Sequence, residues 1–543
     1  MTRDNSPLSL YNDFMKGELA RIRAEQPDID HKEVFKLVAA NWRLQSTSIP
    51  PPPPSPPLKL PSPWIGEDPY CGFPPRLLPE LSMMAASNSI REKSGWWQKY
   101  KDPVIAGRWR QEIKDASIQR GGGWVLREEQ IDYIFKELDW YAGRRQNQVD
   151  LGIEAPVEVA IDCTRRSDGL IPSDLKERLL VCVNLLKDVP DHLKDWHPGS
   201  NKQVLDIIHP SLFPVIAGRT RVTDAEAIPP LDFIGQGKVL EELPVPDLEL
   251  EETEYLSEMY QWLPTDVDVA PEGKVKIKSY INNLHPVEHR EMYHVLEGIF
   301  ERFLPMFEEV LGEISYIDDA SRYRLSLPAN FPIEIPDFKP REETIFDLKT
   351  RSPLQIIVKL ANIELTPESP IYESGAWHVE GMANENIVAT GIYYYHSENI
   401  TESRLNFRIQ VHEPSWYEQG DARGVELMYG LRDEEPLLQY LEGIVTTPDR
   451  CIVFPNIYQH QVQPFRVEDP NKPGIRSGPN KVLAEFAAEK VPPEIYAMIE
   501  KVVNWPMDLE EAKAHREELM KERKYFVQTN RDMFERPFSL CEH

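Results

Sequence analysis

Two histidines and one glutamate in the second half of the sequence have the residue types and spacing of ligands to one metal ion. His378 and Glu380 lie two residues apart in the segment Trp377-His-Val-Glu, so both side chains point the same way in an extended strand. His460 follows an apolar run that ends in a turn and can bring a third donor from a distant strand. Two imidazoles and one carboxylate leave coordination positions open, which suits Fe(II) chemistry with a chelating cosubstrate and oxygen.

A second group of histidines offers a competing metal-ligand pattern. His285 and His289 are spaced i, i+4 in the segment HPVEH, and His294 follows one turn later. Metalloprotease motifs place a glutamate directly after the first histidine, whereas this sequence has Pro286 there. Proline at that place is typical of the first turn of a helix. We therefore expect these histidines to have a structural or supporting role near a helix start.

The elements that must position the donors change in character near residue 346. Beyond that point, short β-rich runs are separated by turn residues, at 354–365, 386–395, 404–411, 424–431 and 449–456. Runs of this kind without long helices between them predict an antiparallel sandwich or barrel.

Earlier in the chain the apolar spacing is that of helices. Residues from about 60 to 345 are mixed but helix-rich, and the spacing of three and four predicts helices at 127–142, 173–187 and 286–311. A last helix is expected at 508–525, where Asp508 and Glu511 form a capping-box pattern.

Composition and charge exclude several classes of protein. Lys and Arg number 61 against 89 Asp and Glu, and the net charge of −28 argues against a chain built as a whole to bind nucleic acid. We find no apolar run of eighteen residues and no apolar signal core at the start, so we expect no membrane association and a cytoplasmic or nuclear location. Five scattered cysteines without a CxxC pair predict neither a disulfide framework nor a cysteine zinc site.

The first residues form a separate segment in front of a proline run at 50–57, which favours a stiff spacer. Residues 9–44 have the pattern of two amphipathic helices, and this segment resembles the high-mobility-group-like box of YABBY-type proteins. Such boxes bind DNA with basic residues and an apolar wedge. Residues 1–48 carry seven basic and seven acidic residues, however, which argues against DNA as a partner. A small helical appendage, or a neighbouring reading frame fused to the gene, explains the segment more simply.

The rest of the chain, about 60–543, resembles a fungal family known as a domain of unknown function, through the segments KLANIEL, WHVEG, ENITESRLNFR, VFPNIYQHQVQPF, SYINNLHPVEH and SLCEH. The pattern His-x-Glu, distant His and later Arg also resembles the Fe(II)/2-oxoglutarate-dependent oxygenases, although their usual carboxylate is aspartate. This resemblance implies an α+β chain with a double-stranded β-helix, or jelly-roll, core. It also implies Fe(II) bound by His378, Glu380 and His460.

The oxygenase resemblance further implies an arginine beyond the second histidine that pairs with the distal carboxylate of 2-oxoglutarate. Arg476, sixteen residues after His460, is the candidate, and Arg466 is the fallback. The sequence departs from the family pattern here, because Ser-Gly-Pro-Asn stands between Arg476 and Lys481.

These patterns predict five segments: a small helical box-like appendage at 1–48, a proline-rich linker at 49–60, a helix-rich scaffold at 61–345, a jelly-roll oxygenase-like core at 346–500 and a C-terminal helical extension at 501–543. The expected function is Fe(II)/2-oxoglutarate-dependent oxidation, by hydroxylation or otherwise, of a substrate that the sequence does not identify. The alternatives are a catalytically silent jelly-roll interaction protein and a DNA-associated protein acting through residues 9–44.

Overall fold

The computed structural model divides the chain into two compact units, Met1–Lys59 and Leu60–His543. The structure describes residues 60–64, 72–119, 125–150, 157–222, 237–244, 256–314, 325, 335–340, 346–414, 417–418, 420–481, 507–534 and 537–539, all of which belong to the second unit. The predicted appendage at 1–48 and nearly all of the proline-rich linker lie outside the described residues.

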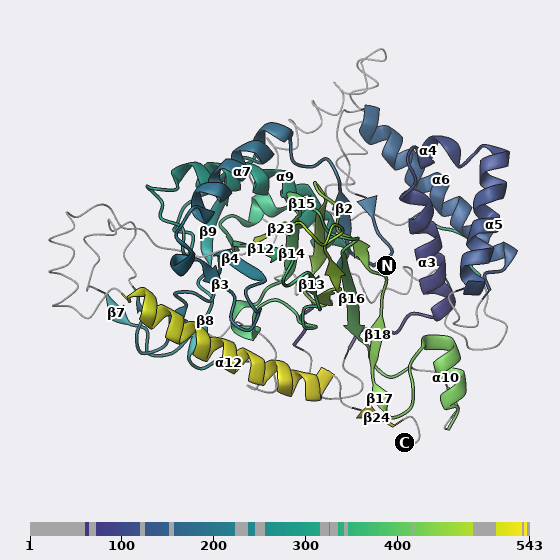
Figure 1. The fold of residues 1–543 in the computed structure, drawn as a ribbon. Helices are drawn as coiled ribbons and strands as arrows, with labels where there is room; N and C mark the ends of the chain where they lie inside the picture. Colours follow the sequence, from purple (N-terminus) through teal and green to yellow (C-terminus); the bar gives the residue numbers. More distant parts are fainter. Residues whose placement is uncertain are drawn as a thin grey trace, which may run out of the picture. The chain divides into compact units, whose positions relative to one another are not determined.

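Four helices early in the second unit pack together around buried apolar side chains (Figure 1). They are α3 (Leu78–Arg91), α4 (Trp96–Lys99), α5 (Pro103–Gln119) and α6 (Glu128–Asp150). Ile131, Ile134 and Leu138 follow the helical spacing of three and four, and all three are fully buried. The helix predicted at 127–142 is therefore confirmed, and it continues to Asp150.

A nine-stranded antiparallel sheet contains strands from both halves of the unit. Its order is β1 (Val157–Glu158), β2 (Arg165–Ser167), β20 (Cys451–Pro455), β14 (Ala389–Tyr393), β23 (Gly474–Lys481), β12 (Lys359–Leu365), β4 (Val204–Ile208) and β3 (Asp195–Trp196), with β15 (His396–Glu398) paired to β23. Strands β1 to β4 come from the segment predicted as a helix-rich scaffold. The predicted boundary at residue 345 therefore runs through this sheet, because β4 pairs directly with β12.

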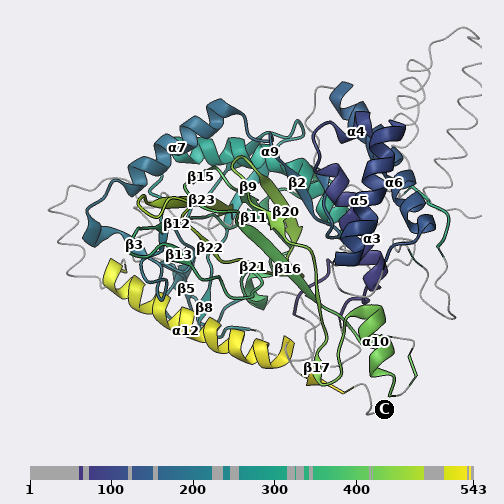
Figure 2. The ribbon, with the colours of Figure 1, turned by 45° about the vertical axis from the view of Figure 1, so that its right-hand side comes forward.

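Two helices pack against one face of this sheet, as Figures 1 and 2 show. They are α7 (Ser173–Lys187) and α9 (Arg290–Ile314). Val295 and Ile299 of α9 are fully buried in one cluster with Leu360 of β12 and Val453 of β20. The structure confirms both predicted helices, although α9 begins four residues after Pro286.

A smaller antiparallel sheet faces the large one across a shared core. It contains β16 (Arg404–Gln410), β18 (Leu438–Tyr440), β19 (Ile444–Val445) and β21 (Gln459–Val462). Phe407 of β16 packs edge-to-face on Phe454 of β20, with ring centroids 5.0 Å apart. The fold is thus mixed, with helices and several antiparallel sheets, and within the described residues no sheet closes on itself as a barrel.

Four two-stranded sheets and one three-stranded sheet complete the described fold. They are β5 (Val215–Ile216) with β8 (Tyr260–Gln261), β6 (Arg221–Val222) with β7 (Lys238–Val239), β9 (Thr265–Val269) with β10 (Val275–Ile277) and β11 (Leu354–Ile356), β13 (Ile371–Tyr372) with β22 (Phe465–Arg466), and β17 (Glu435–Pro436) with β24 (Pro537–Phe538).

The prediction of a strand at 424–431 is wrong, because helix α10 (Ala422–Tyr429) covers most of this segment. Asp421 caps this helix by accepting a hydrogen bond from the Gly424 amide at 3.0 Å. Gly430 ends it in the left-handed conformation, with a φ of 73°. Val425 and Met428 are buried at helical spacing, and their apolar character alone does not distinguish a short helix from a strand.

The C-terminal helix α12 (Leu509–Phe534) begins where the capping box predicts. The Glu511 amide donates a hydrogen bond to Asp508 Oδ1 at 2.7 Å. No described helix combines the length and the apolar character that crossing a bilayer requires.

Candidate metal centre

A backbone bridge brings two of the predicted ligands side by side. The His378 amide donates a hydrogen bond to the His460 carbonyl at 3.3 Å, and the His460 amide donates to the His378 carbonyl at 2.9 Å. Asn456, in the turn after β20, fixes the third ligand, because its Oδ1 accepts from the Glu380 amide and its side-chain amide donates to the Glu380 carbonyl, both at 2.9 Å. The turn expected before His460 thus positions Glu380 as well.

The three predicted ligand side chains converge. Their candidate donor atoms all lie within 4.8 Å of one another. His460 Nε2 is 3.6 Å from a carboxylate oxygen of Glu380, and the two imidazole centroids are 4.4 Å apart. Glu380 and His460 are each 3% exposed, whereas His378 is half-buried, so access to this point is from the His378 side.

His378 and Glu380 have the protonation states that a cation needs. His378 Nδ1 donates to the Ala376 carbonyl at 2.8 Å, which leaves Nε2 with a free lone pair. Burial, followed by the nearby charge of His460, lowers the pKa of His378 to about 4. Burial alone would raise the pKa of Glu380, but its contact with His460 and the positive charge of Lys359 hold that pKa well below its ordinary value. At neutral pH the centre therefore offers a neutral imidazole and a carboxylate.

Aromatic side chains form an apolar wall behind His460. The rings of Phe454 and Phe407 lie 5.0 Å and 6.4 Å from the His460 ring. Trp377, the neighbour of His378, packs instead on the guanidinium of Arg408 at 4.8 Å. The wall excludes water from one side of the centre.

The two predicted carboxylate-binding arginines occupy different environments. Arg476 lies on β23, is 7% exposed and stacks 4.6 Å over the ring of Tyr394. Its Nε and Nη2 are buried and have no hydrogen-bond partner among the described residues. Arg466 is exposed on β22. Tyr394 belongs to the same buried cluster as Phe407 and Phe454, so Arg476 and His460 border one core.

Lys359 is a cation that the sequence motifs did not identify. It is half-buried on β12, and its charge lowers the pKa of both Glu380 and His378. The register pairs Ile363 with Arg476, and Lys359 lies four residues before Ile363 on the same face of β12. The signal that could have identified Lys359 is the strand pattern of KLANIEL, in which Lys359, Ala361 and Ile363 alternate with Leu360 and Asn362 and share one face.

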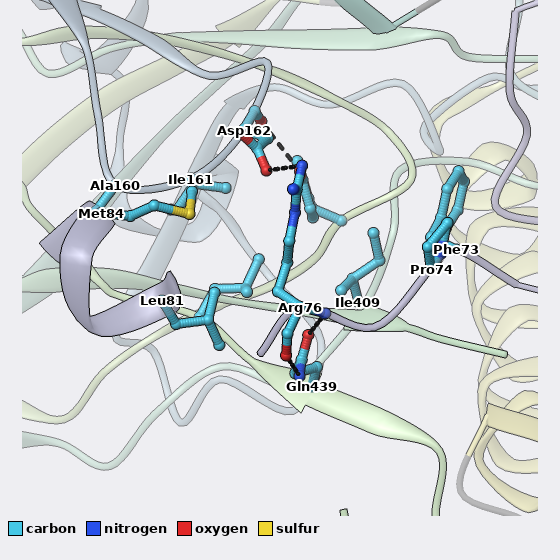
Figure 3. A pocket seen from close by; sticks show the side chains of 12 residues that line it. Phe73, Pro74, Arg76, Leu81, Met84, Ala160, Ile161, Asp162, Ile409 and Gln439 are labelled. Atoms are coloured by element: carbon cyan, nitrogen blue, oxygen red, sulfur yellow. Dashed lines mark hydrogen bonds and ion pairs between the residues drawn. The ribbon is translucent and has the colours of Figure 1, made fainter. Parts of the chain in front are cut away.

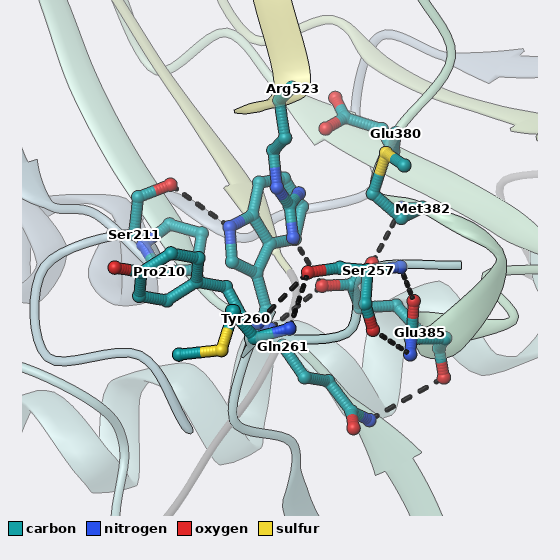
Figure 4. A network of polar contacts seen from close by, with 12 residues as sticks. Pro210, Ser211, Ser257, Tyr260, Gln261, Glu380, Met382, Glu385 and Arg523 are labelled. Carbon is teal, nitrogen blue, oxygen red and sulfur yellow. Dashed lines mark hydrogen bonds and ion pairs between the residues drawn. The ribbon is translucent and has the colours of Figure 1, made fainter. Parts of the chain in front are cut away.

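A buried polar network holds the chain just beyond Glu380 (Figure 4). Glu385 accepts hydrogen bonds from the Met382 amide at 2.5 Å and the Trp262 amide at 2.7 Å. It also pairs with Arg523 of α12, whose guanidinium lies 4.1 Å from the centre of the Trp262 ring. The C-terminal helix therefore anchors the segment that carries one of the candidate ligands.

The competing histidine group does not form a centre among the described residues. His285 Nδ1 accepts a hydrogen bond from the Glu288 amide at 3.1 Å, just before α9 begins. His294 contacts Glu297 at 3.1 Å within the helix. Each histidine thus bonds a neighbour three residues further along the chain, which fits the structural role that Pro286 predicts for this segment.

A small cavity of about 30 Å³ has room for a water molecule and is lined by other residues than the three ligands (Figure 3). Arg76 crosses it to pair with Asp162 at 2.8 Å, and the Arg76 amide donates to the side chain of Gln439 at the same distance. None of the three candidate ligands lines this cavity. The convergence of the three donor atoms, and not this cavity, indicates where the candidate chemistry lies.

Together these features define a mixed α+β protein with a candidate centre of two imidazoles and one carboxylate. The chain belongs to the DUF4246 family, described as proteins of unknown function. The family matches residues 128–343 and 321–479, and its N-terminal domain matches residues 55–112.

The first residues are similar to a different family, the C-terminal part of YABBY proteins, over residues 2–47. Protein DROOPING LEAF and Protein YABBY 6 of Oryza sativa subsp. japonica are each 53% identical to this chain over 34 residues. The match spans 6% of this chain and 18% and 16% of those proteins, so the chain covers less than a fifth of these relatives.

Among solved structures, the Fe(II)/(alpha)ketoglutarate-dependent dioxygenase TqaL is similar at 12% identity and a TM-score of 0.21, over 42% of this chain and 67% of that one. A bsmA homolog from Methylobium petroleophilum PM1 is similar at 10% identity and a TM-score of 0.14, over 25% and 43% of the two chains. Because both TM-scores are low, a functional assignment depends on the residues of this chain alone.

Proposed function

We propose that this protein is an Fe(II)/2-oxoglutarate-dependent oxygenase whose jelly-roll core takes most of its strands from residues 346–500. The observation that carries the proposal is the convergence of His378, Glu380 and His460, whose donor atoms lie within 4.8 Å of one another. Two antiparallel sheets that face each other across a common core support the jelly-roll assignment.

The donor set fits Fe(II). Two neutral imidazoles and a carboxylate are the ligands of non-haem iron centres that keep positions open for cosubstrate and oxygen. Iron, when bound, would let oxygen oxidise 2-oxoglutarate to succinate and carbon dioxide and, in the same reaction, oxidise a second substrate. Of the three ligands only His378 is not fully buried, so these molecules would reach the centre from its side.

The residues of the chain orient and shield this chemistry. The Ala376 carbonyl holds the His378 ring with Nε2 free, and Asn456 fixes the backbone of Glu380 from both sides. The aromatic wall behind His460 keeps water away from one side of the centre.

Arg476 is the residue that we propose binds the distal carboxylate of 2-oxoglutarate. Two of its nitrogens are buried without a partner among the described residues, which is costly for a guanidinium unless an anion pairs with it. The exposed Arg466 carries no such cost. Lys359 lies close enough to act on Glu380 and His378 and adds a second positive charge on the same side.

The test is anaerobic addition of Fe(II) and 2-oxoglutarate to the full-length protein. We expect a weak visible charge-transfer band that His378→Ala abolishes and that His396→Ala, at a half-buried histidine on β15, leaves intact. Absence of the band in folded, iron-loaded wild-type protein would overturn the proposal and leave a catalytically silent interaction protein.

A further inference from the structure

We propose that His197, Asp206 and His209 bind a second divalent metal ion, of the zinc class, at the edge of the nine-stranded sheet. The three donors lie within 4.8 Å of one another. They come from one hairpin: His197 follows β3, Asp206 lies on β4 and His209 directly follows β4. No step of the proposed oxidation uses them.

The first evidence for an ion is a buried carboxylate oxygen that has nothing to pair with among the described residues. The Asp206 side chain is 1% exposed, and its Oδ2 lies 2.8 Å from His197 Nδ1. Its Oδ1 is buried and has no hydrogen-bond partner in the described parts of the chain. An unpaired buried carboxylate oxygen is costly, and a cation between Asp206 and the histidines would remove that cost.

The neighbouring cations among the described residues do not pair closely with the Asp206 carboxylate. Arg516 of α12 directs both terminal nitrogens to Asp195, at 2.5 Å and 2.9 Å, and comes no closer than 4.0 Å to Asp206. The charge of Lys359 acts on Asp206 and His209 only at longer range. Asp195 neutralises Arg516, so the carboxylate of Asp206 remains available to a metal ion.

His209 is buried beside Asp206, and His197 gives access to the site from solvent. His209 is 5% exposed, and burial lowers its pKa to about 3, so its ring is neutral at neutral pH. The His209 Nδ1 accepts a hydrogen bond from the Ser211 amide at 3.2 Å, at the long end of the range for N–H donors. An ion on Nδ1 would take the place of this bond, and an ion on Nε2 would require the proton on Nδ1, so either would displace it. The His197 side chain is 28% exposed, which gives the ion a path of entry and leaves a fourth position for water.

The hairpin is also connected to the first centre. Ser211, two residues after His209, accepts a hydrogen bond from Trp262 Nε1 at 2.9 Å. The Trp262 amide in turn donates to Glu385, five residues after Glu380. Figure 4 labels Ser211, Glu385 and Glu380. An ion at the hairpin would therefore stabilise the sheet edge next to this chain of hydrogen bonds.

The test is metal stoichiometry of the full-length, tag-free protein, stripped by a chelator, equilibrated anaerobically with zinc and analysed by mass spectrometry. We expect two zinc ions per chain in the wild type, one in His197→Ala and one in His378→Ala. His192→Ala, at an exposed histidine of the same segment, should still bind two. Asp206→Asn keeps the side-chain shape and should bind one zinc ion. Zinc should raise the Tm of the wild type more than the Tm of Asp206→Asn, because the variant lacks the ion at the hairpin.

The outcomes separate this inference from the proposed function. Two ions in His197→Ala, or one ion in the wild type that only His378→Ala removes, would overturn the second site and leave the oxygenase proposal standing. One ion in the wild type that only His197→Ala removes would support the second site and remove the support for the iron centre.

Discussion

The two histidine clusters use the same donor types but are assembled in different ways. His378 and His460 meet across a bridge between segments far apart in the chain, whereas His197, Asp206 and His209 belong to one hairpin. Closing a short hairpin costs little chain entropy, while the distant pair forms only after both sheets have packed. Damage to the fold should therefore weaken the first cluster before the second.

The largest expected difference lies in chemistry. Glu380→Gln should abolish the iron-dependent formation of succinate from 2-oxoglutarate, because an uncharged amide is a poor ligand at the proposed iron centre. Asp206→Asn makes the matched change at the hairpin and should leave succinate formation intact. The measurement is succinate released per chain under air with added Fe(II). Equal losses in the two variants would show that the clusters act as one site.

A structural change should separate the clusters next. Glu385→Gln breaks the buried pair with Arg523 and weakens the support of Glu380, and such losses cost about 3 kcal/mol. We expect the free energy of unfolding in urea to fall by about that amount. Iron affinity should also fall, while zinc retention by the hairpin should change little.

Glu518→Gln is the control for this change. Glu518 lies on α12, the helix that carries Arg523, but its partner Lys521 is on the exposed face of that helix. This variant should leave the urea midpoint unchanged. An equal loss of zinc and iron in Glu385→Gln would contradict the difference between a local and a distant cluster.

The same difference explains what the sequence could reveal. His378 and Glu380, two residues apart, give a visible pattern, although His378 forms only an isolated β-bridge and no strand covers the pair; the apolar run before His460 marks the third ligand. His197 and Asp206 come together only through the turn of a hairpin between two short strands, which no periodicity indicates. Helices with strong apolar spacing, such as α7, were predicted within a few residues.

The errors have physical causes as well. The strands from 157 to 208 are too short to give a periodic signal, so their place in the large sheet was missed. The capping residue Asp421 and the terminal Gly430 were the signals that could have identified α10 as a helix.

A smaller effect is expected on the affinity for 2-oxoglutarate, and it tests which cation belongs to the first cluster. Arg476→Gln removes charge-assisted hydrogen bonds to the distal carboxylate and should weaken binding by about 10- to 100-fold. Arg466→Gln, at the exposed arginine, should leave the affinity unchanged. The measurement is anaerobic titration of the charge-transfer band. A greater loss in Lys359→Met than in Arg476→Gln would move the carboxylate-binding role to Lys359.

The smallest effect is the pH dependence of the metal-free protein. The pKa of His209 is about 3 in the fold, below the ordinary value near 6.5, so the unfolded chain binds the extra proton first as pH falls. Stability should therefore be full above pH 6.5 and decline toward pH 3, by up to about 2 kcal/mol between pH 7 and 5. His209→Gln should flatten this slope in urea unfolding, whereas His192→Ala should not. Because the pKa of His378 is about 4, His378→Gln should flatten the slope as much as His209→Gln between pH 7 and 5, and by less than His209→Gln below pH 5. A larger flattening in His378→Gln would make the distant cluster, and not the hairpin, the more strongly desolvated of the two.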